Sequence, residues 1–392
     1  MSSPEPSNQI LSGPEAPQDN SPLFSLLPPE VRSQIFSYAL MDYPDPSPKK
    51  RYKDWTIYKR PTYSAPRMND TRLLRTCRAV YRECWFMPFV LKEHTHWIGH
   101  EDRAPPHYQA DQAINKFTET LKQIVEQQGG KDVEVERLRV FAQMWKLEQG
   151  GLADVLKLPH LNPRTVTLTI RHADWWWWEN DEPLRFEGQW IKAVNETLRP
   201  SVREVCIEIE SVLRKKIQIN AIATQMIERW SFKRTDGVVL YPEATGGSIT
   251  GDIWTGSSCW QKNRWTRDET EPGKIQYYIL SVRFRPEPEI ERRGGRIDDV
   301  ARNFAENDIF DAEKMRLDLP RLPNLGYPPF SILETMHWES PDESEEEGAE
   351  SSDEGLSKGS NYSNHGKGLV MPGDPDDRMN TEDAWVVRLS KM

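Results

Sequence analysis

The clearest pattern of apolar and polar positions lies near the N-terminus and predicts an amphipathic helix over residues 28–40. Its apolar positions recur at i, i+4 and i+7 or i+8, and they are Val31, Ile35, and Tyr38 or Ala39. The positions expected to face water are Arg32, Ser33 and Gln34. Pro29 suits the first helical position, because its missing N–H is not needed there and its fixed φ favours the helix.

A second helix is predicted over residues 70–85, where Asp70 or Thr71 can cap the N-terminus. Its apolar positions repeat at helical spacing and are Leu73, Leu74, Cys77, Val80, Tyr81, Cys84 and Trp85. Short helices are stable only when an apolar face is buried, so we expect the two helices to pack on each other. A Pro- and Tyr-rich excursion, residues 41–69, separates them.

Strand and helix patterns alternate in the middle of the chain. Apolar residues recur with the period of two that is typical of strands in segments near 137–142, 165–170 and 204–210. Helical patterns lie at 152–158, at 186–198 and from about 211 to 230. This alternation favours βαβ units with a parallel sheet.

The strand pattern also indicates how the sheet is covered. Parallel strands buried on both faces are usually continuous apolar runs, whereas these strands alternate. We therefore expect helices on one face and a polar or partly open second face, as in leucine-rich-repeat-like receptors. Because the strand spacing has no fixed period, that likeness concerns architecture only.

From residue 231, short apolar segments separated by Gly and Ser loops predict an antiparallel extension of the sheet, and a short helix is predicted near 297–307.

The expected fold class is mixed α+β or α/β: a helical module, then a mostly parallel sheet with helices on one face. The expected divisions are a disordered segment 1–20, the helical module 21–100, a connecting segment 101–135, the Trp-rich sheet domain 136–286, a charged, weakly structured segment 287–338, and an acidic disordered tail 339–392, in which 384–389 can form a small docking strand.

Composition and charge narrow the function classes. Hydrophobic residues make up 37% of the chain and the mean hydropathy is −0.74, so we expect sizeable disordered segments. The net charge of −10 belongs mainly to residues 339–355, which hold nine carboxylates and no Lys or Arg and leave about −1 elsewhere. Such a near-neutral body gives no electrostatic case for binding nucleic acid.

No segment has the ~18 apolar residues needed to cross a bilayer. The first residues lack the features of a secretory signal, so we expect an intracellular protein of the cytoplasm or nucleus that binds no membrane. Among four cysteines, Cys77 and Cys84 stand two helical turns apart, which exceeds the reach of a disulfide. No CxxC occurs, so reduced thiols are expected.

Two motifs in the N-terminal helices are Leu27-Pro28-x-Glu30-Val31-x-x-x-Ile35-Phe36 and Leu73-Leu74-x-Thr76-Cys77-Arg78-x-Val80-Tyr81-x-Glu83. Together they resemble the F-box-like domain of filamentous-fungal proteins. The resemblance continues through residues 141–145, 171–179 and 254–258 and spans roughly residues 21–285.

An F-box implies docking to a Skp-type adaptor of a cullin ubiquitin ligase. The adaptor contacts implied by this resemblance are Leu27, Pro28, Val31, Ile35, Leu73, Leu74 and Val80. The chain departs from the usual F-box in the 41–69 excursion, where F-boxes place a short middle helix and a tight turn.

Four consecutive tryptophans, Trp175, Trp176, Trp177 and Trp178, follow the strand near 165–170, beyond the carboxyl end where open α/β sheets usually bind ligands. One interpretation is an aromatic platform for an unknown protein target, framed by Asp174 and Glu179. The other is a set of large rings that plugs the end of the sheet. Four consecutive rings cannot all point inward, so we expect one or two at the surface.

Other patterns give little support to catalysis or metal binding. His94, His96 and His100 have metal-like spacing, but no cysteine partner is nearby, which favours loop or core positions. The glycines of 246–252 lack the lysine of a phosphate loop, which favours a hairpin loop, and residues 256–259 lack the second glycine of a nucleophile elbow. We expect no catalytic residue, metal or cofactor.

Three hypotheses follow: a ubiquitin-ligase substrate receptor, an interaction scaffold whose F-box-like helices are only structural, and an enzyme with its site in the Trp-rich crevice. Exposure of the stripe on the two helices favours the receptor, whereas its burial favours the scaffold. The enzyme requires a concave pocket with converging ionisable groups near the four tryptophans.

Overall fold

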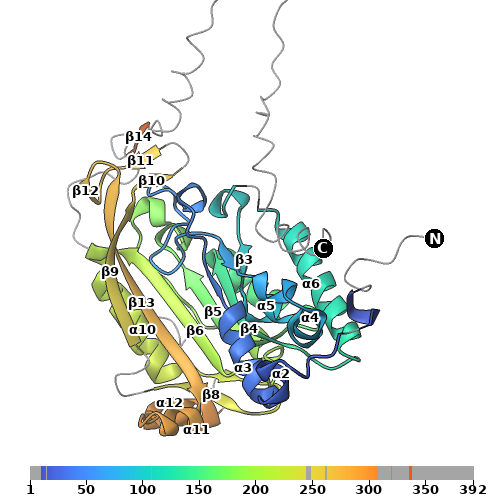
Figure 1. The fold of residues 1–392 in the computed structure, drawn as a ribbon. Helices are drawn as coiled ribbons and strands as arrows, with labels where there is room; N and C mark the ends of the chain where they lie inside the picture. Colours follow the sequence, from blue (N-terminus) through green and yellow to red (C-terminus); the bar gives the residue numbers. More distant parts are fainter. Residues whose placement is uncertain are drawn as a thin grey trace, which may run out of the picture.

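A curled nine-stranded sheet forms the centre of the computed structural model (Figure 1), which describes residues 10–14, 16–106, 108–243, 249–260, 263–307, 319 and 335–337. The strands run in the order β3-β4-β5-β6-β13-β8-β7, and β9 and β12 also pair with β13. They are β3 (Glu93–Ile98), β4 (Glu134–Ala142), β5 (Asn162–Ile170), β6 (Glu204–Val212), β7 (Phe232–Lys233), β8 (Val239–Pro242), β9 (Ile249–Ser257), β12 (Glu269–Glu271) and β13 (Lys274–Pro286). Strands β3 to β6 are parallel and β13 joins them antiparallel, which confirms the predicted parallel core and antiparallel extension.

One face of the sheet is apolar and covered by helices. Val140, Leu168 and Ile207 lie in register on β4, β5 and β6, and all three are fully buried. Burying such a side chain contributes roughly 1.5–3 kcal/mol. The helices that follow the sheet strands in the chain are α6 (Ala110–Gln127), α7 (Met144–Glu148), α8 (Gly151–Leu156), α9 (Trp190–Asn195) and α10 (Lys216–Arg229). Helix α10 begins later than expected from the sequence, because β6 continues to Val212.

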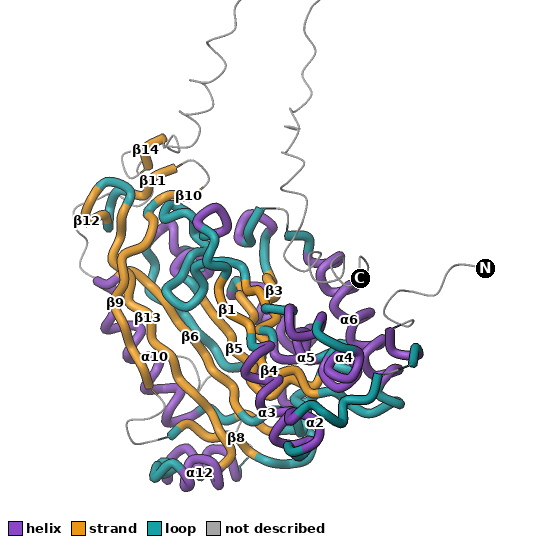
Figure 2. The backbone as a smooth tube through the Cα atoms, in the orientation of Figure 1, coloured by secondary structure: helices purple, strands orange, loops and turns teal. Residues whose placement is uncertain are grey.

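The opposite face of the sheet is polar, as expected, but it is covered rather than open. The guanidinium of Arg139 lies 3.0 Å from a Glu93 oxygen and 2.5 Å from a Glu208 oxygen, with all three residues buried. Residues 41–69, called the strap below, cross this face (Figure 2). Tyr63 of the strap packs against Phe141 of β4, with ring centroids 5.4 Å apart.

The strap begins and ends as a short ribbon of two strands, β1 (Asp42–Pro44) and β2 (Arg67–Asn69), and contains the 3₁₀ turn η1 (Pro48–Lys50). It connects the N-terminal helices α2 (Pro22–Ser25) and α3 (Pro29–Leu40) to the 3₁₀ turn η2 (Arg72–Arg75), α4 (Arg78–Cys84) and α5 (Met87–Leu91). Buried side chains of α3, η2 and α4 share one core, so the two helical segments pack together as predicted.

The single helix predicted over 70–85 is wrong in its middle. The chain forms η2, becomes extended at Cys77 (φ −156°, ψ 164°) and then starts α4. The hydroxyl of Thr76 donates to the Leu73 carbonyl at 2.8 Å, and the Asp70 carboxylate accepts from the Arg72 N–H at 3.0 Å. Such local side-chain bonds compete with continuous helix.

Two smaller units complete the described part of the fold. Helices α11 (Glu287–Arg292) and α12 (Asp299–Glu306) cover Tyr241 of β8, so the segment expected to be weakly structured contributes a small core of its own. A three-stranded sheet joins β10 (Cys259–Trp260), β11 (Asn263–Trp265) and β14 (Thr335–His337).

Three expectations about the ends and loops have separate outcomes. In the segment 1–20, Ile10 and Leu11 are partly buried against the N-terminal core, although this segment was expected to be disordered. Of the hairpin loop predicted at 246–252, the part from Ile249 onward belongs to strand β9. The tail 339–392 lies outside the described residues, so the expectations for its acidic run and for the strand at 384–389 stay open.

The buried ion pairs of Arg139 predict a large effect on stability. Replacing it, as Arg139→Met, leaves two buried carboxylates without their cation, and we expect the free energy of unfolding to fall by about 3–5 kcal/mol. The control is Arg164→Met, because the Arg164 side chain is 38% exposed and pairs with Glu134 and Glu136, which are exposed to a similar degree; about 0–1 kcal/mol is expected there. Urea unfolding measures both, and equal losses would contradict the expected difference.

Candidate functional site

Helix α3 turns its apolar stripe towards solvent. Val31 is 41% exposed, Ile35 43% and Tyr38 70%, whereas Phe36 and Leu40 are fully buried. This reverses the expected orientation of the helix. Its inward side carries Arg32, whose Nε donates to the Glu83 carboxylate of α4 at 3.1 Å. That ion pair and the burial of Phe36 and Leu40 fix which side faces the core.

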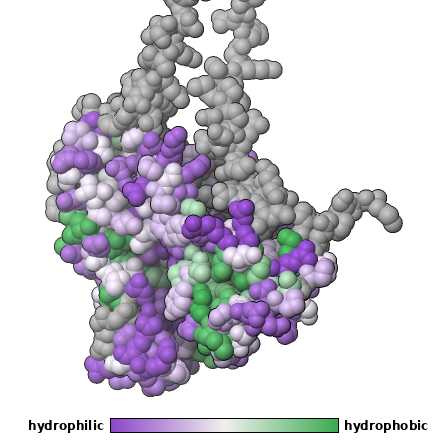
Figure 3. Space-filling model, viewed as in Figure 1, coloured by the Kyte–Doolittle hydropathy of each residue, from purple (hydrophilic) through white to green (hydrophobic). Residues whose placement is uncertain are grey.

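We call these outward side chains, together with their exposed neighbours, the outer face of α3; its members are Leu26, Val31, Ile35, Tyr38 and Met41. Figure 3 shows apolar surface over this part of the molecule. The face comprises a helical row at i, i+4 and i+7 and one apolar residue beyond each helix end.

The seven residues expected to contact an adaptor do not share one surface. Leu74 and Val80 are 3% and 2% exposed and lie in the protein's own core. Leu27 and Leu73 are half-buried, and Pro28 is exposed at the start of α3. The outer face of α3 is therefore accessible, whereas the second helical segment mainly supports it.

The four tryptophans divide between interior and surface. Trp175 is buried and its indole N–H donates to the Glu210 carbonyl at 2.8 Å, and Trp178 is also buried. Trp176 is half-buried, and Trp177, whose φ is +54°, is 61% exposed. The expectation that one or two rings reach the surface is confirmed.

The carboxylates that frame this run differ in the same way. Asp174 is buried in a two-point ion pair with Arg171, with its two oxygens 2.6 and 3.0 Å from Nε and Nη2. Glu179 is half-buried on the 3₁₀ turn η5 (Trp178–Asn180). Of the six residues expected to bind a target, Trp176, Trp177 and Glu179 are accessible, and Asp174, Trp175 and Trp178 belong to the interior.

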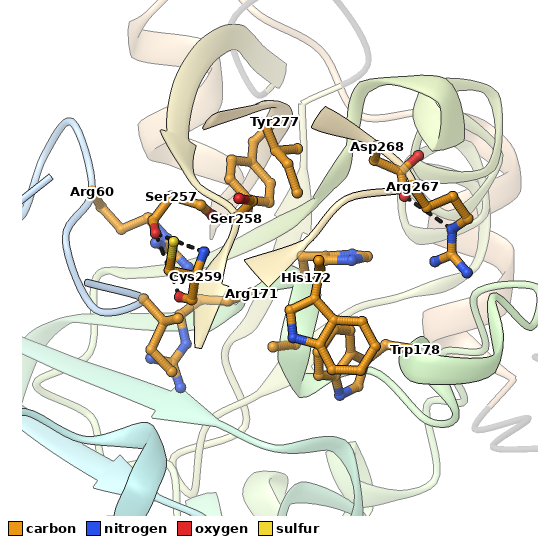
Figure 4. Close-up of a pocket in the computed structure, with 14 residues that line it drawn as sticks. Arg60, Arg171, His172, Trp178, Ser257, Ser258, Cys259, Arg267, Asp268 and Tyr277 are labelled. Carbon is orange, nitrogen blue, oxygen red and sulfur yellow. Dashed lines mark hydrogen bonds and ion pairs between the residues drawn. The ribbon is translucent and has the colours of Figure 1, made fainter. Parts of the chain in front are cut away.

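A small cavity of about 40 Å³ lies beside Trp178, at the carboxyl end of β5 (Figure 4). The polar and aromatic side chains around it include Arg60, Arg171, His172, Arg267, Asp268 and Tyr277, with Ser257, Ser258 and Cys259 on one wall. Five separated segments of the chain bring these residues together. Sequence reasoning identified only Trp178 among them, although Arg171 and His172 directly follow a predicted strand.

Three of the ionisable groups that line the cavity are held neutral by their surroundings: His172, Cys259 and Tyr277. Burial lowers the pKa of His172 to about 3, and the positive charge of the nearby Lys215 lowers it further. The Nδ1 atom of His172 lies 3.1 Å from the Ser211 hydroxyl. Burial raises the pKa of the Cys259 thiol and that of the Tyr277 phenol. The converging groups required by the enzyme hypothesis are therefore present, but neither the thiol nor the phenol is an ionised nucleophile at neutral pH.

The other histidines occupy structural positions where they are described. His94 and His96 are buried on β3 beside Phe117 of α6, and burial lowers their pKa values to about 3 and about 4. His100 is exposed and pairs with Asp102 at 3.0 Å. Within the described residues, no group of three or more potential ligands could hold a metal ion, and all four cysteines are free thiols.

Comparisons of the chain with family models, with curated proteins and with solved structures found no match. In the described part of the chain, every helix is too short or too polar to cross a membrane.

The lowered pKa of His172 predicts a pH dependence of stability. Between about pH 6.5 and 3 the unfolded chain binds a proton at this histidine that the folded chain does not. The free energy of unfolding therefore falls with decreasing pH, by up to about 1.4 kcal/mol per pH unit for this group. We expect His172→Gln to reduce that slope, as measured by urea unfolding at pH 7, 6 and 5. His100→Gln, at an exposed histidine, is the control, and an unchanged slope in His172→Gln would contradict the prediction.

Proposed function

We propose that the protein is an F-box-like interaction protein that serves as a substrate receptor of a cullin-type ubiquitin ligase. A Skp-type adaptor docks on the outer face of α3, and a target protein binds near Trp176 and Trp177. The observation that carries this proposal is the outward row of Val31, Ile35 and Tyr38 on a helix whose other side is anchored in the core.

An apolar helical row is the kind of surface that enters a groove on a partner. Residues at i, i+4 and i+7 form one side of a helix and act as anchors when an apolar groove receives them. Burying a Val or Ile side chain fully contributes roughly 1.5–3 kcal/mol of favourable free energy. A partner that covers the exposed row would therefore gain binding free energy. Large contiguous apolar patches on soluble proteins commonly mark such interaction sites.

The long excursion between the two helices is compatible with an F-box-like pair. Asp42 and Asn69 are directly paired at the base of the strap, and the Asn69 amide donates to the Leu40 carbonyl at 2.8 Å. The strap therefore leaves and returns at nearly the same point. Its two ends let α3 and α4 pack as if a short turn joined them.

The scaffold alternative rests on the burial of Leu74 and Val80, which makes the second helical segment structural. In that case the outer face of α3 would bind a partner other than a Skp-type adaptor, or none. The enzyme alternative rests on the cavity beside Trp178. Adaptor binding separates the first proposal from both alternatives.

Co-purification with a Skp-type adaptor tests the receptor proposal. We expect the tagged full chain to retain the co-expressed adaptor, and Val31→Asp/Ile35→Asp to reduce retention at least tenfold, because a carboxylate buried in an apolar groove costs several kcal/mol. Ile217→Asp is the matched control, since Ile217 is 73% exposed on α10, and it should retain the adaptor fully.

Two outcomes would overturn the proposal. The first is no adaptor retained by the unmodified chain under conditions that retain a known F-box protein. The second is equal retention by the α3 variant and the Ile217 variant.

A further inference from the structure

One buried donor in the wall of the cavity beside Trp178, the Nε–H of Arg60, lacks a hydrogen-bond partner in the described part of the chain. The side chain of Arg60 is only 7% exposed. Its Nη2 lies 3.0 Å from a Glu210 oxygen, and its Nη1 donates to the Lys59 carbonyl at 2.5 Å. Its Nε has no hydrogen-bond partner among the residues that the structure describes. A buried, unsatisfied N–H of a charged group is costly, so this atom points to a missing acceptor.

The surroundings of Arg60 favour an anion as that acceptor. Arg60 and Arg267 approach the cavity from opposite sides, with His172 and Trp178 between them (Figure 4). Among the described residues that line the cavity, Asp268 is the one carboxylate, and it is already held by ion pairs with Arg214 and Arg267.

Three of the residues that line the cavity are arginines, namely Arg60, Arg171 and Arg267. Each of them has an ion-pair partner: Arg60 pairs with Glu210, Arg171 with Asp174, and Arg267 with Asp268. The charged side chains at the cavity wall are therefore mainly cationic, which favours an anion over a cation there.

The position and size of the cavity agree with a small ligand. It lies beyond the carboxyl ends of the parallel strands β5 and β6, where open α/β sheets commonly bind ligands. A water molecule needs about 10–15 Å³ measured in this way, so about 40 Å³ admits roughly three water-sized groups. That is the size of one carboxylate with its attached carbon.

We propose that this cavity binds a carboxylate group, with the Nε–H of Arg60 donating to one of its oxygens. The rings of Trp178 and Tyr277 then line the space for the carbon to which the carboxylate is attached. The site involves none of the outer face of α3, so it is independent of the proposed adaptor docking.

Thermal unfolding of the full chain in sodium acetate tests the site, with sodium chloride at equal ionic strength as the reference. A ligand that binds only the folded state raises the unfolding midpoint as its concentration increases. We expect acetate to raise the midpoint, and Arg60→Lys, which keeps the charge but removes Nε, to weaken the apparent affinity at least tenfold. Arg164→Lys is the matched control at an ion-paired arginine far along the chain, and it should respond as the unmodified protein does.

A second variant tests the cavity without altering any charge. Ala173 lines the cavity, so Ala173→Leu fills part of it and should also abolish the acetate response. This variant keeps the test decisive if Arg60→Lys does not fold.

Three results would overturn the proposal. An unmodified protein that does not respond to acetate would show that only water fills the cavity. Equal responses of the unmodified protein and both cavity variants would show a general solute effect. Stabilisation by inorganic phosphate but not by acetate would assign the site to a different anion.

Discussion

The structure depends on one constraint: the charged residues on the second face of the sheet must be paired once that face is covered. An unpaired buried charge costs several kcal/mol, so a polar face can be buried only if each charged group on it has a partner of opposite charge. Arg139 meets this requirement between Glu93 and Glu208, and Arg60 of the strap meets it at Glu210. The strap is thus held to the sheet by charge pairing as well as by packing of its tyrosines.

The same pairing attaches the helical module to the sheet. Asp42, one residue beyond the C-cap of α3, is buried and forms ion pairs with Arg67 of the strap and Arg137 of β4. Its carboxylate also accepts a hydrogen bond from the backbone N–H of Glu93 at 3.0 Å. Glu93 is the first residue of β3, the strand at the edge of the sheet. One carboxylate therefore joins the end of α3, the base of the strap and the sheet, and it leaves the outer face of α3 directed away from them.

Local patterns were sufficient for elements whose environment is simple. Alternation along β4 to β6 identified these strands, because one face packs on helices and the other carries polar side chains. The orientation of α3 was not predictable in this way, because Ile35 and Phe36 are adjacent and both apolar. The burial of Phe36 and the ion pair of Arg32 with Glu83 decide between them, and both depend on contacts with segments distant in the chain. The cavity was missed for a related reason: Arg60 reaches it through the strap, and no local pattern indicates a partner as distant in the chain as Glu210.

The strap connects the two proposed sites, since it starts at the end of α3 and carries Arg60 to the cavity. A shared segment couples two sites only if it has two arrangements that both ligands distinguish. Between the sites, however, the strap is anchored at Asp42 by Arg67 and Arg137, and its ends are paired in β1 and β2. Filling the cavity would satisfy Nε of Arg60 without breaking these anchors, so the arrangement favours two energetically independent sites on one rigid support.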